Sequence, residues 1–262
     1  NNGFFKVLRS GTHTTFQDLG YKNKQHLGIT TGGAVDNDLY YLSNKLLNNK
    51  DNTASIEFSI QGPSLKVFNK TCRIVISGKV NFNIISSKKI FTGIPNKSYL
   101  LKNGDIIDIL HTIDSNYGYL SIEGGFKLKK QFDSYSILSI SKIGPNDGEK
   151  FSNNQNIYFN KKGSNIESFL NIETNNNNKI IRVLPGPQMN YFFPKKIYNF
   201  FNNTFKISNS SNRMGIRLRD NICKAVKSHD IPSEGISPGS IQIPGDGNPI
   251  VLMNDHPTIG GY

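Results

Sequence analysis

The sequence predicts a mainly β protein, built as barrels or sandwiches with one or a few short helices. Short strand-like segments recur along the 262 residues and are separated by turn residues. The chain contains 24 Gly and 11 Pro but no Trp, a composition that favours many turns over long helices. Its 17 Phe and 11 Tyr supply large apolar anchors for a core. This composition excludes a collagen, a coiled coil and a helical bundle.

Five strands are predicted in the first 150 residues. They cover Phe4–Leu8, Ser55–Ile60, Arg73–Ser77, Ile106–Leu110 and Tyr117–Glu123. Ile74 and Ile76 share one face of the third segment, because side chains alternate along a strand. The pair Gly124–Gly125 marks the turn that ends the fifth.

One helix is predicted after Asp36. Its carboxylate can accept hydrogen bonds from the free N–H groups of the first turn. The apolar face has helical spacing and consists of Leu39, Leu42 and Leu46. Asn48 and Asn49 can adopt the left-handed conformation that ends a helix.

A connection is predicted between two halves of the chain. Residues 151–179 are rich in Asn and, apart from Ile166–Ile172, low in apolar content, so we expect a connection that can include a short helix. The connection follows an N-terminal β-rich half at 1–150 and precedes a C-terminal half at 180–262. In the second half we expect strands at Ile180–Leu184, Thr204–Ile207, Ser240–Ile243 and Pro249–Met253.

The formal net charge of +12 does not by itself identify a partner. Only six of the 31 basic residues are arginines, and the lysines are scattered along the chain. A nucleic-acid surface usually clusters Lys and Arg with aromatic residues between them. We therefore interpret the charge as general solvation and expect no nucleic-acid partner, with a basic binding face as the alternative.

The sequence also narrows the cellular setting. Cys72 and Cys223 lie in apolar surroundings and are too few for a disulfide framework, so we expect buried free thiols. No apolar run reaches the roughly 18 residues of a membrane span, and the first residues do not form a signal peptide. We expect a cytoplasmic protein that does not contact membranes.

The familiar cofactor motifs do not occur. There is no phosphate-binding G-x-x-x-x-G-K-[ST] loop and no dinucleotide-binding G-x-G-x-x-G. The five histidines are scattered without metal-ligand spacing, so no metal site is predicted. These patterns argue against a self-contained NTPase, a Rossmann oxidoreductase and a zinc protein.

Polar residues gather instead in loops that are punctuated by glycine. Glycine lets backbone amides approach a ligand, and the neighbouring Gln, Asp, His and Arg supply directed hydrogen bonds. The main loops are Gly11–Gly20, Gly32–Asp36, Ser211–Leu218, Ser233–Pro249 and Asn254–Tyr262.

On these loops the chain resembles the biotin-dependent carboxyltransferase, or allophanate hydrolase subunit 2, family. The motifs that carry the resemblance are Thr14–Gly20, Gly33–Asp36, Glu57 with Gly62–Pro63, Gly124–Gly125, Leu184–Pro187, Ser211–Gly215 and Ser233–Tyr262. They cover nearly the whole chain. The resemblance implies a mainly β fold with cyclophilin-like barrels. It also implies that the family pattern runs on past Tyr262, so the C-terminal half is expected to be truncated.

The resemblance implies three possible functions. The first is the C subunit of ATP-dependent 5-oxoprolinase, which opens 5-oxoproline to glutamate. It would work with a B-type partner, related to allophanate hydrolase subunit 1 and KipI, and with the A subunit of 5-oxoprolinase. ATP would bind at a shared site. The second is half of a urea carboxylase-type carboxyltransferase, and the third is a non-catalytic, KipA-like antagonist of a sensor-kinase inhibitor. In each case this chain does not itself carry biotin.

Two positions depart from the family pattern. Tyr21 stands where the family usually has Arg after Asp-Leu-Gly, and Asp133–Ile137 replaces a segment that normally reads Gly-Ser-Arg-Ser-Thr. The chain therefore lacks two arginines at these positions.

Candidate site residues each have a structural alternative. Arg213 can hold a carboxylate or phosphate by its planar fork, or can form a structural ion pair. His256 can transfer protons with Asp255 orienting it or binding substrate, or both can be loop-packing residues. Gln242, near Asp246, can bind an amide group of a small substrate or only bond within a strand. Gln17 and Asp18 are candidate substrate ligands or turn caps.

Overall fold

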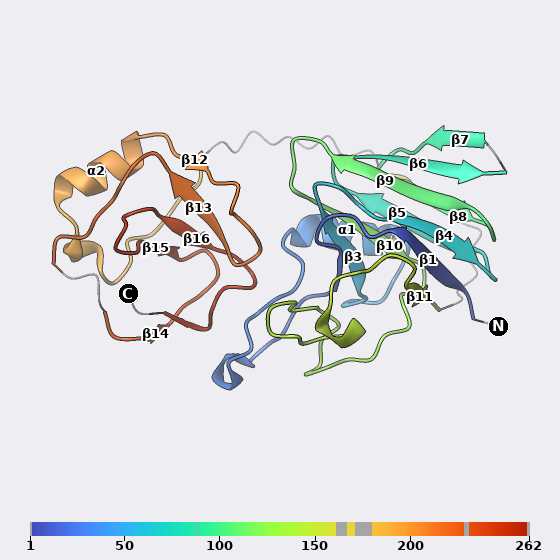
Figure 1. Ribbon diagram of the computed structural model, residues 1–262, viewed down its shortest axis with the longest axis horizontal. Coiled ribbons are helices and arrows are strands. Elements are labelled where there is room, and N and C mark those ends of the chain that lie inside the picture. Colours follow the sequence, from blue (N-terminus) through green and yellow to red (C-terminus); the bar gives the residue numbers. More distant parts are fainter. Residues whose placement is uncertain (1, 88, 161–166, 171–179, 228–230, 261–262) are drawn as a thin grey trace. The chain divides into compact units, whose positions relative to one another are not determined.

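The computed structural model describes residues 2–87, 89–160, 167–170, 180–227 and 231–260 (Figure 1). The chain divides into two compact units. The first comprises Asn1–Tyr21 and Gly32–Glu173, and the second comprises Lys22–Thr31 and Thr174–Tyr262. Sheets dominate both units, so the mainly β prediction is confirmed.

One sheet of the first unit has six strands in the order β11-β1-β4-β9-β6-β7, and all neighbours are antiparallel. The strands are β1 (Phe4–Arg9), β4 (Ser64–Phe68), β6 (Val80–Ser86), β7 (Lys89–Thr92), β9 (Ile106–Thr112) and β11 (Asn156–Tyr158). Along β6, buried apolar residues alternate with polar ones, as expected for a strand with one face toward a core.

The second sheet has five strands in the order β2-β3-β10-β5-β8. They are β2 (Thr15–Gln17), β3 (Ser55–Ser59), β5 (Cys72–Ser77), β8 (Ser98–Leu101) and β10 (Tyr117–Ile122). Phe58, Ile76 and Leu120 of this sheet belong to one buried cluster together with Phe5 and Leu65 of the first sheet. The described strands of the first unit therefore form two sheets that share one core, and each sheet presents an apolar face to it.

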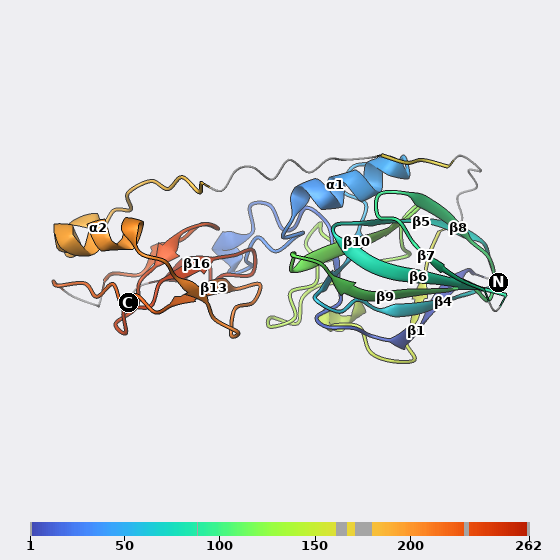
Figure 2. The ribbon, with the colours of Figure 1, turned by 90° about the horizontal axis from the view of Figure 1, so that it is seen from above.

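A helix, α1 (Asn37–Leu46), lies on the other face of the second sheet, over β5 and β10 (Figure 2). Asp36 Oδ1 accepts a hydrogen bond from the Leu39 N–H at 3.0 Å, so the predicted N-cap is confirmed. Beyond the helix Asn48 has φ +50°, the left-handed conformation predicted there. Asn49 does not share it. Instead its side chain bonds Asn44 and the Ile122 carbonyl.

Part of the predicted connection belongs to the core of the first unit. β11 pairs with β1, and Phe159, which follows it, is fully buried. The short helix expected within 151–179 is not found in the described residues 151–160 and 167–170, and the rest of that range lies outside the described residues. Phe169 instead forms an isolated bridge with Lys97.

The second unit contains shorter strands. A four-stranded sheet has the order β12-β13-β16-β15, and a two-stranded sheet pairs β14 with β17. The strands are β12 (Lys206–Ile207), β13 (Gly215–Arg219), β14 (Glu234–Gly235), β15 (Ile241–Gln242), β16 (Ile250–Leu252) and β17 (Ile259–Gly260). The unit also contains α2 (Pro194–Asn202), which begins at a proline, a residue suited to the first helical turn. No helix in the described parts of the chain is both long and apolar enough to cross a bilayer.

The predicted strand at Ile180–Leu184 is wrong. These residues form no strand, and Ile180, Ile181 and Leu184 are 82%, 88% and 91% exposed. Strand propensity alone does not make a strand, because the backbone groups need a paired neighbour. The predicted strands in 204–207, 240–243 and 249–253 are found in shortened form as β12, β15 and β16.

Candidate functional site

Asp18 is a fully buried carboxylate in the glycine-rich loops of the first unit. The Ser134 and Ser136 hydroxyls donate to its Oδ1 at 2.6 and 2.7 Å, and the Gly20 N–H donates to the same oxygen at 2.9 Å. The Tyr135 N–H donates to Oδ2 at 2.8 Å. Asp18 therefore joins its own loop to the segment 134–136 and has no room for a further ligand on Oδ1.

Gln17 is also fully buried. Its Nε2 donates to Thr15 Oγ1 at 2.9 Å and to the Ile137 carbonyl at 3.0 Å, whereas its Oε1 has no hydrogen-bond partner among the described residues. These contacts tie β2 to the same segment that holds Asp18. The roles of Gln17 and Asp18 in substrate binding stay predictions.

The two departures from the family pattern meet at this network. The Tyr21 hydroxyl, where the family usually has Arg, donates to the Ser136 carbonyl at 2.6 Å and is buried. Asp133, where the family segment has Gly, adopts φ +69°. A positive φ explains why glycine suits that position.

Glu57 and Tyr119 fix the loop before α1. The Tyr119 hydroxyl donates to Glu57 Oε2 at 2.6 Å, and the Val35 N–H donates to the same oxygen at 2.9 Å. Gly33 has φ +82°, and a Cβ there would lie 2.9 Å from the Gly20 nitrogen. The motif Gly33–Asp36 therefore packs against the Asp18 loop, where only glycine fits.

In the second unit Arg213 and Asp255 form a buried, bidentate ion pair. Arg213 Nε and Nη2 donate to Asp255 Oδ2 and Oδ1, each at 2.8 Å, and the two side chains are only 3% and 11% exposed. The Asp255 N–H also donates to the Arg213 carbonyl at 2.9 Å. This edge of the Arg213 fork is already occupied, so a ligand carboxylate would reach it only by replacing Asp255.

His256 lies directly after this pair and is fully buried. Its Nδ1 contacts the Pro257 carbonyl oxygen, and its Nε2 has no hydrogen-bond partner among the described residues. A carbonyl oxygen only accepts, so Nδ1 carries the proton in the neutral ring and Nε2 keeps its lone pair. Asp255 does not orient His256 through a side-chain hydrogen bond, because Nδ1 contacts the Pro257 carbonyl and Nε2 has no partner among the described residues.

The turn at 254–256 is also held by the segment Lys22–Thr31, which belongs to the second unit. The hydroxyls of Thr30 and Thr31 both donate to the Asn254 carbonyl, at 2.9 and 3.1 Å. We name Asn254–His256 the clamped turn, because Arg213 and these two threonines fix it. No sequence signal pointed to the threonines, since they precede the turn by more than 220 residues.

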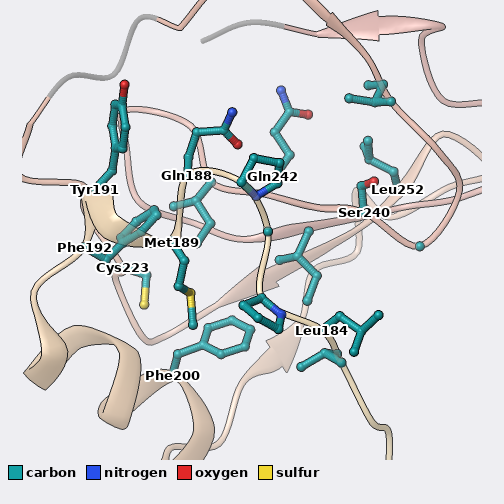
Figure 3. Close-up of a pocket in the computed structure, with 18 of the residues that line it drawn as sticks. Leu184, Gln188, Met189, Tyr191, Phe192, Phe200, Cys223, Ser240, Gln242 and Leu252 are labelled. Carbon is teal, nitrogen blue, oxygen red and sulfur yellow. The ribbon is translucent and has the colours of Figure 1, made fainter.

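Gln242 lines a pocket of the second unit that has a volume of about 680 Å³ (Figure 3). β16 joins this region to the clamped turn, because it pairs with β13 on one side and β15 on the other. Gln188 shares the pocket, and its Nε2 donates to Glu234 Oε1 at 2.5 Å. Figure 3 shows both carboxamides pointing toward one end, away from the apolar side chains of Met189 and Phe200. Gln188 follows the Leu184–Pro187 motif, and that proximity is the signal that could have identified it.

Asp246 lies outside the pocket, in an exposed turn. The Asn248 side chain and N–H donate to its carboxylate at 2.9 and 3.0 Å, and these bonds hold the pKa of Asp246 below its ordinary value.

The structure thus brings Arg213, Asp255 and His256 together and places Gln242 in the pocket of the same unit. Gln17 and Asp18 belong to the first unit. Within the described residues no three His, Cys, Asp or Glu side chains could hold a metal ion.

Residues 27–262 match the family described as the carboxyltransferase domain, subdomain A and B. The chain belongs to this family. The resemblance found in the sequence motifs is therefore confirmed. The match covers the clamped turn, the pocket and most of the first unit.

Curated relatives align with nearly the whole chain. The 5-oxoprolinase C subunit of Haemophilus influenzae is 28% identical over 256 residues, which are 98% of this chain and 81% of that protein. The Escherichia coli protein of the same name is 28% identical and covers 98% and 82%. Urea amidolyase of Saccharomyces cerevisiae is 27% identical, but the chain corresponds to only 15% of its length.

Solved structures share the fold. A crystal structure of the protein TTHA0988 matches with a TM-score of 0.84 and 21% identity, over 100% of this chain and 50% of that one. Urea amidolyase of K. lactis matches with a TM-score of 0.82 and 23% identity, over 99% and 17%. The chain thus spans half or less of these solved proteins, and at such identities the likeness establishes the fold.

Proposed function

We propose that the chain is the C subunit of an ATP-dependent 5-oxoprolinase. The observation that carries this proposal is the alignment with two proteins of that name over 98% of this chain and more than four-fifths of theirs. The chain matches the urea amidolyases equally fully, but it corresponds to 15% of those proteins. The identity to the two 5-oxoprolinase C subunits, 28% each, is also slightly above the 27% and 25% to the urea amidolyases.

The reaction requires activation of a lactam. Amide resonance makes the lactam carbonyl a poor electrophile and its nitrogen a poor leaving group. ATP transfers its terminal phosphoryl group to the carbonyl oxygen and leaves as ADP, which removes that resonance. One water then adds to the activated carbon and the ring C–N bond breaks to give an acyl phosphate. A second water releases inorganic phosphate and glutamate. No phosphate-binding loop motif occurs in the sequence, which supports an ATP site completed by partner proteins.

The pocket of the second unit supports a role in holding the lactam. Gln242 offers a carboxamide to the amide group, and the cationic side chains of Arg182 and Lys196 line the same pocket and suit the carboxylate of 5-oxoproline. A volume of about 680 Å³ leaves space for a second reactant beside a small lactam.

We assign the clamped turn to proton transfer. His256 presents an unprotonated Nε2 in its neutral form, as a general base requires. Because His256 is fully buried, the turn has to move for substrate to reach it. Asp255 and Arg213 then act as positioning residues that hold the turn through their ion pair. Direct binding of a substrate anion by Arg213 stays a prediction.

The exposed apolar segment Ile180–Leu184 supports a role for this chain in a complex of several subunits. Three of its side chains are more than four-fifths exposed, and an apolar surface of this kind commonly marks a protein interface. We propose the B-type protein and the A subunit of 5-oxoprolinase as the partners.

Reconstitution with purified proteins tests the proposed function. We expect no ATP-coupled glutamate release by this chain alone, and release when the A and B subunits are added. Release by the chain alone would contradict the shared ATP site. The absence of release from the full set, with an authentic 5-oxoprolinase C subunit in place of this chain as positive control, would contradict the function.

The relatives named urea amidolyase favour a second candidate, the carboxyltransferase part of a urea carboxylase. Biotin would then arrive on another protein. Transfer of labelled CO₂ from carboxybiotin to urea, in place of 5-oxoproline opening, would identify this function.

A further inference from the structure

Two glutamine carboxamides line the pocket, and only one of them is hydrogen-bonded to another described side chain. Gln188 commits its Nε2 to Glu234 at 2.5 Å. Gln242 lines the same pocket, is partly exposed to it, and makes no side-chain hydrogen bond to any residue that the structure describes. The N–H donors and the Oε1 acceptor of Gln242 therefore remain available to a ligand (Figure 3).

Gly260 keeps the space beside this carboxamide open. β17 pairs with β14, and a Cβ on Gly260 would lie 3.9 Å from Gln242 Nε2 and 3.2 Å from Ile236 Cδ1. A methyl group at this position would crowd Ile236 and contact the Gln242 amide nitrogen, and glycine avoids both contacts. The backbone φ of Gly260 is not positive, so the open space, rather than backbone strain, distinguishes glycine here.

A carboxamide presents a donor and an acceptor along one edge. A lactam presents the complementary pair along one edge too, because its ring forces the amide to be cis. An open-chain secondary amide is trans, so its N–H and C=O point in opposite directions and only one of them can meet the same carboxamide.

From this complementarity we infer that Gln242 selects cis amides over trans amides by a two-point hydrogen-bond pairing. Gln242 Nε2 donates to the ligand carbonyl oxygen, and the ligand N–H donates to Gln242 Oε1. The inference rests on the proposed function, which supplies a lactam substrate, and it assigns the distinction between a ring and a peptide chain to one residue.

NMR titration of the full chain with small amides, in the absence of ATP and partner proteins, tests this pairing. The probes are 5-oxoproline, 2-pyrrolidinone, N-methyl-2-pyrrolidinone and N-methylacetamide. The third lacks the lactam N–H, and the fourth is a trans amide. We expect the first two to bind at the pocket and the last two to bind about tenfold more weakly than 2-pyrrolidinone.

Three variants separate the pairing from general effects on the pocket. Gln242→Ala removes both hydrogen bonds and should weaken binding of 2-pyrrolidinone about tenfold to a hundredfold. Gly260→Ala should weaken binding by narrowing the space beside the amide. Gln188→Ala is the matched control, since its amide nitrogen is bonded to Glu234, and it should change 2-pyrrolidinone binding less than about threefold.

The pairing is overturned if 2-pyrrolidinone does not bind, if Gln242→Ala binds it as the parent does, or if N-methylacetamide binds as well as the lactam. Failure of the proposed function looks different. In that case the lactams bind through Gln242, but the reconstituted complex releases no glutamate.

Discussion

At the scale of single residues, the chain buries charge in two different ways. Asp18 has no ion-pair partner among the described residues and is stabilised by four hydrogen-bond donors from two segments of the first unit. Arg213 and Asp255 instead neutralise one another in the second unit. A buried ion pair gains little over an apolar contact, but removing one partner leaves a costly unpaired charge.

Asp255→Asn should therefore destabilise the protein strongly. We expect a loss of about 3 kcal/mol in the free energy of unfolding, because the amide replaces one acceptor of the guanidinium with a donor. Denaturant unfolding of the second unit measures it. The control is Asp220→Asn, which breaks the exposed pair with Lys206 and should cost less than about 1 kcal/mol. Equal losses in the two variants would contradict the buried-pair argument.

The turn at Asp246 predicts a local effect of pH. Hydrogen bonds from the Asn248 side chain, then from its N–H, lower the pKa of Asp246, so the folded state binds the proton less readily than the unfolded state. This contribution to stability is complete above the unfolded pKa, about 3.9, and is lost as pH falls through the lower folded value. Asn248→Ala should raise the pKa of Asp246 toward its ordinary value. NMR titration of the carboxyl carbon checks this, and no change would rule out the Asn248 side chain as the cause.

The site could be predicted only in part from sequence. Adjacent residues such as Asp255 and His256 are visible as a candidate pair, and the glycine-rich loops mark where polar groups gather. The partner of Asp255 is 42 residues away, and Thr30 contacts Asn254 across 224 residues. Such contacts depend on how the strands pair, which single-sequence patterns do not determine.

At the scale of elements, prediction succeeded where a local signal and a partner coincide. β10 is apolar on the face that packs on the core, and it has paired neighbours on both sides. The segment 180–184 is also rich in apolar residues, but it has no paired neighbouring strand among the described residues. β6 was missed, although its alternation of Val80, Phe82 and Ile84 with polar residues is a readable signal.

The cap of α1 is a signal that acts locally and can be tested locally. Asp36→Ala should lower the free energy of unfolding of the first unit by about 1 kcal/mol, because the Leu39 N–H loses its acceptor. Asp36→Asn keeps an acceptor oxygen and should cost only a few tenths of that, roughly 0.3 kcal/mol. Thermal unfolding followed by circular dichroism compares the two variants. Equal destabilisation would show that the side-chain cap does not stabilise the helix.

At the scale of the whole molecule, the net charge of +12 gives a prediction about nucleic acid. The lysines are spread along the chain, so few phosphates would be neutralised together and few counterions released. We expect duplex DNA to bind weakly and to dissociate by about 200 mM salt. Fluorescence anisotropy at several salt concentrations measures this. Sequence-specific binding that persists at physiological salt would instead establish a basic binding face.

Residues 22–31 leave the first unit after Tyr21, join the second, and return at Gly32. No single cut in the chain can therefore release either unit whole. A fragment that begins near residue 174 would lack Thr30 and Thr31, and with them both hydroxyl donors to the Asn254 carbonyl. A gene for the isolated second unit would have to encode residues 22–31 and join them to the segment that begins near residue 174. In evolution or in engineering, the two units of this chain can therefore be exchanged only as a set of interleaved segments.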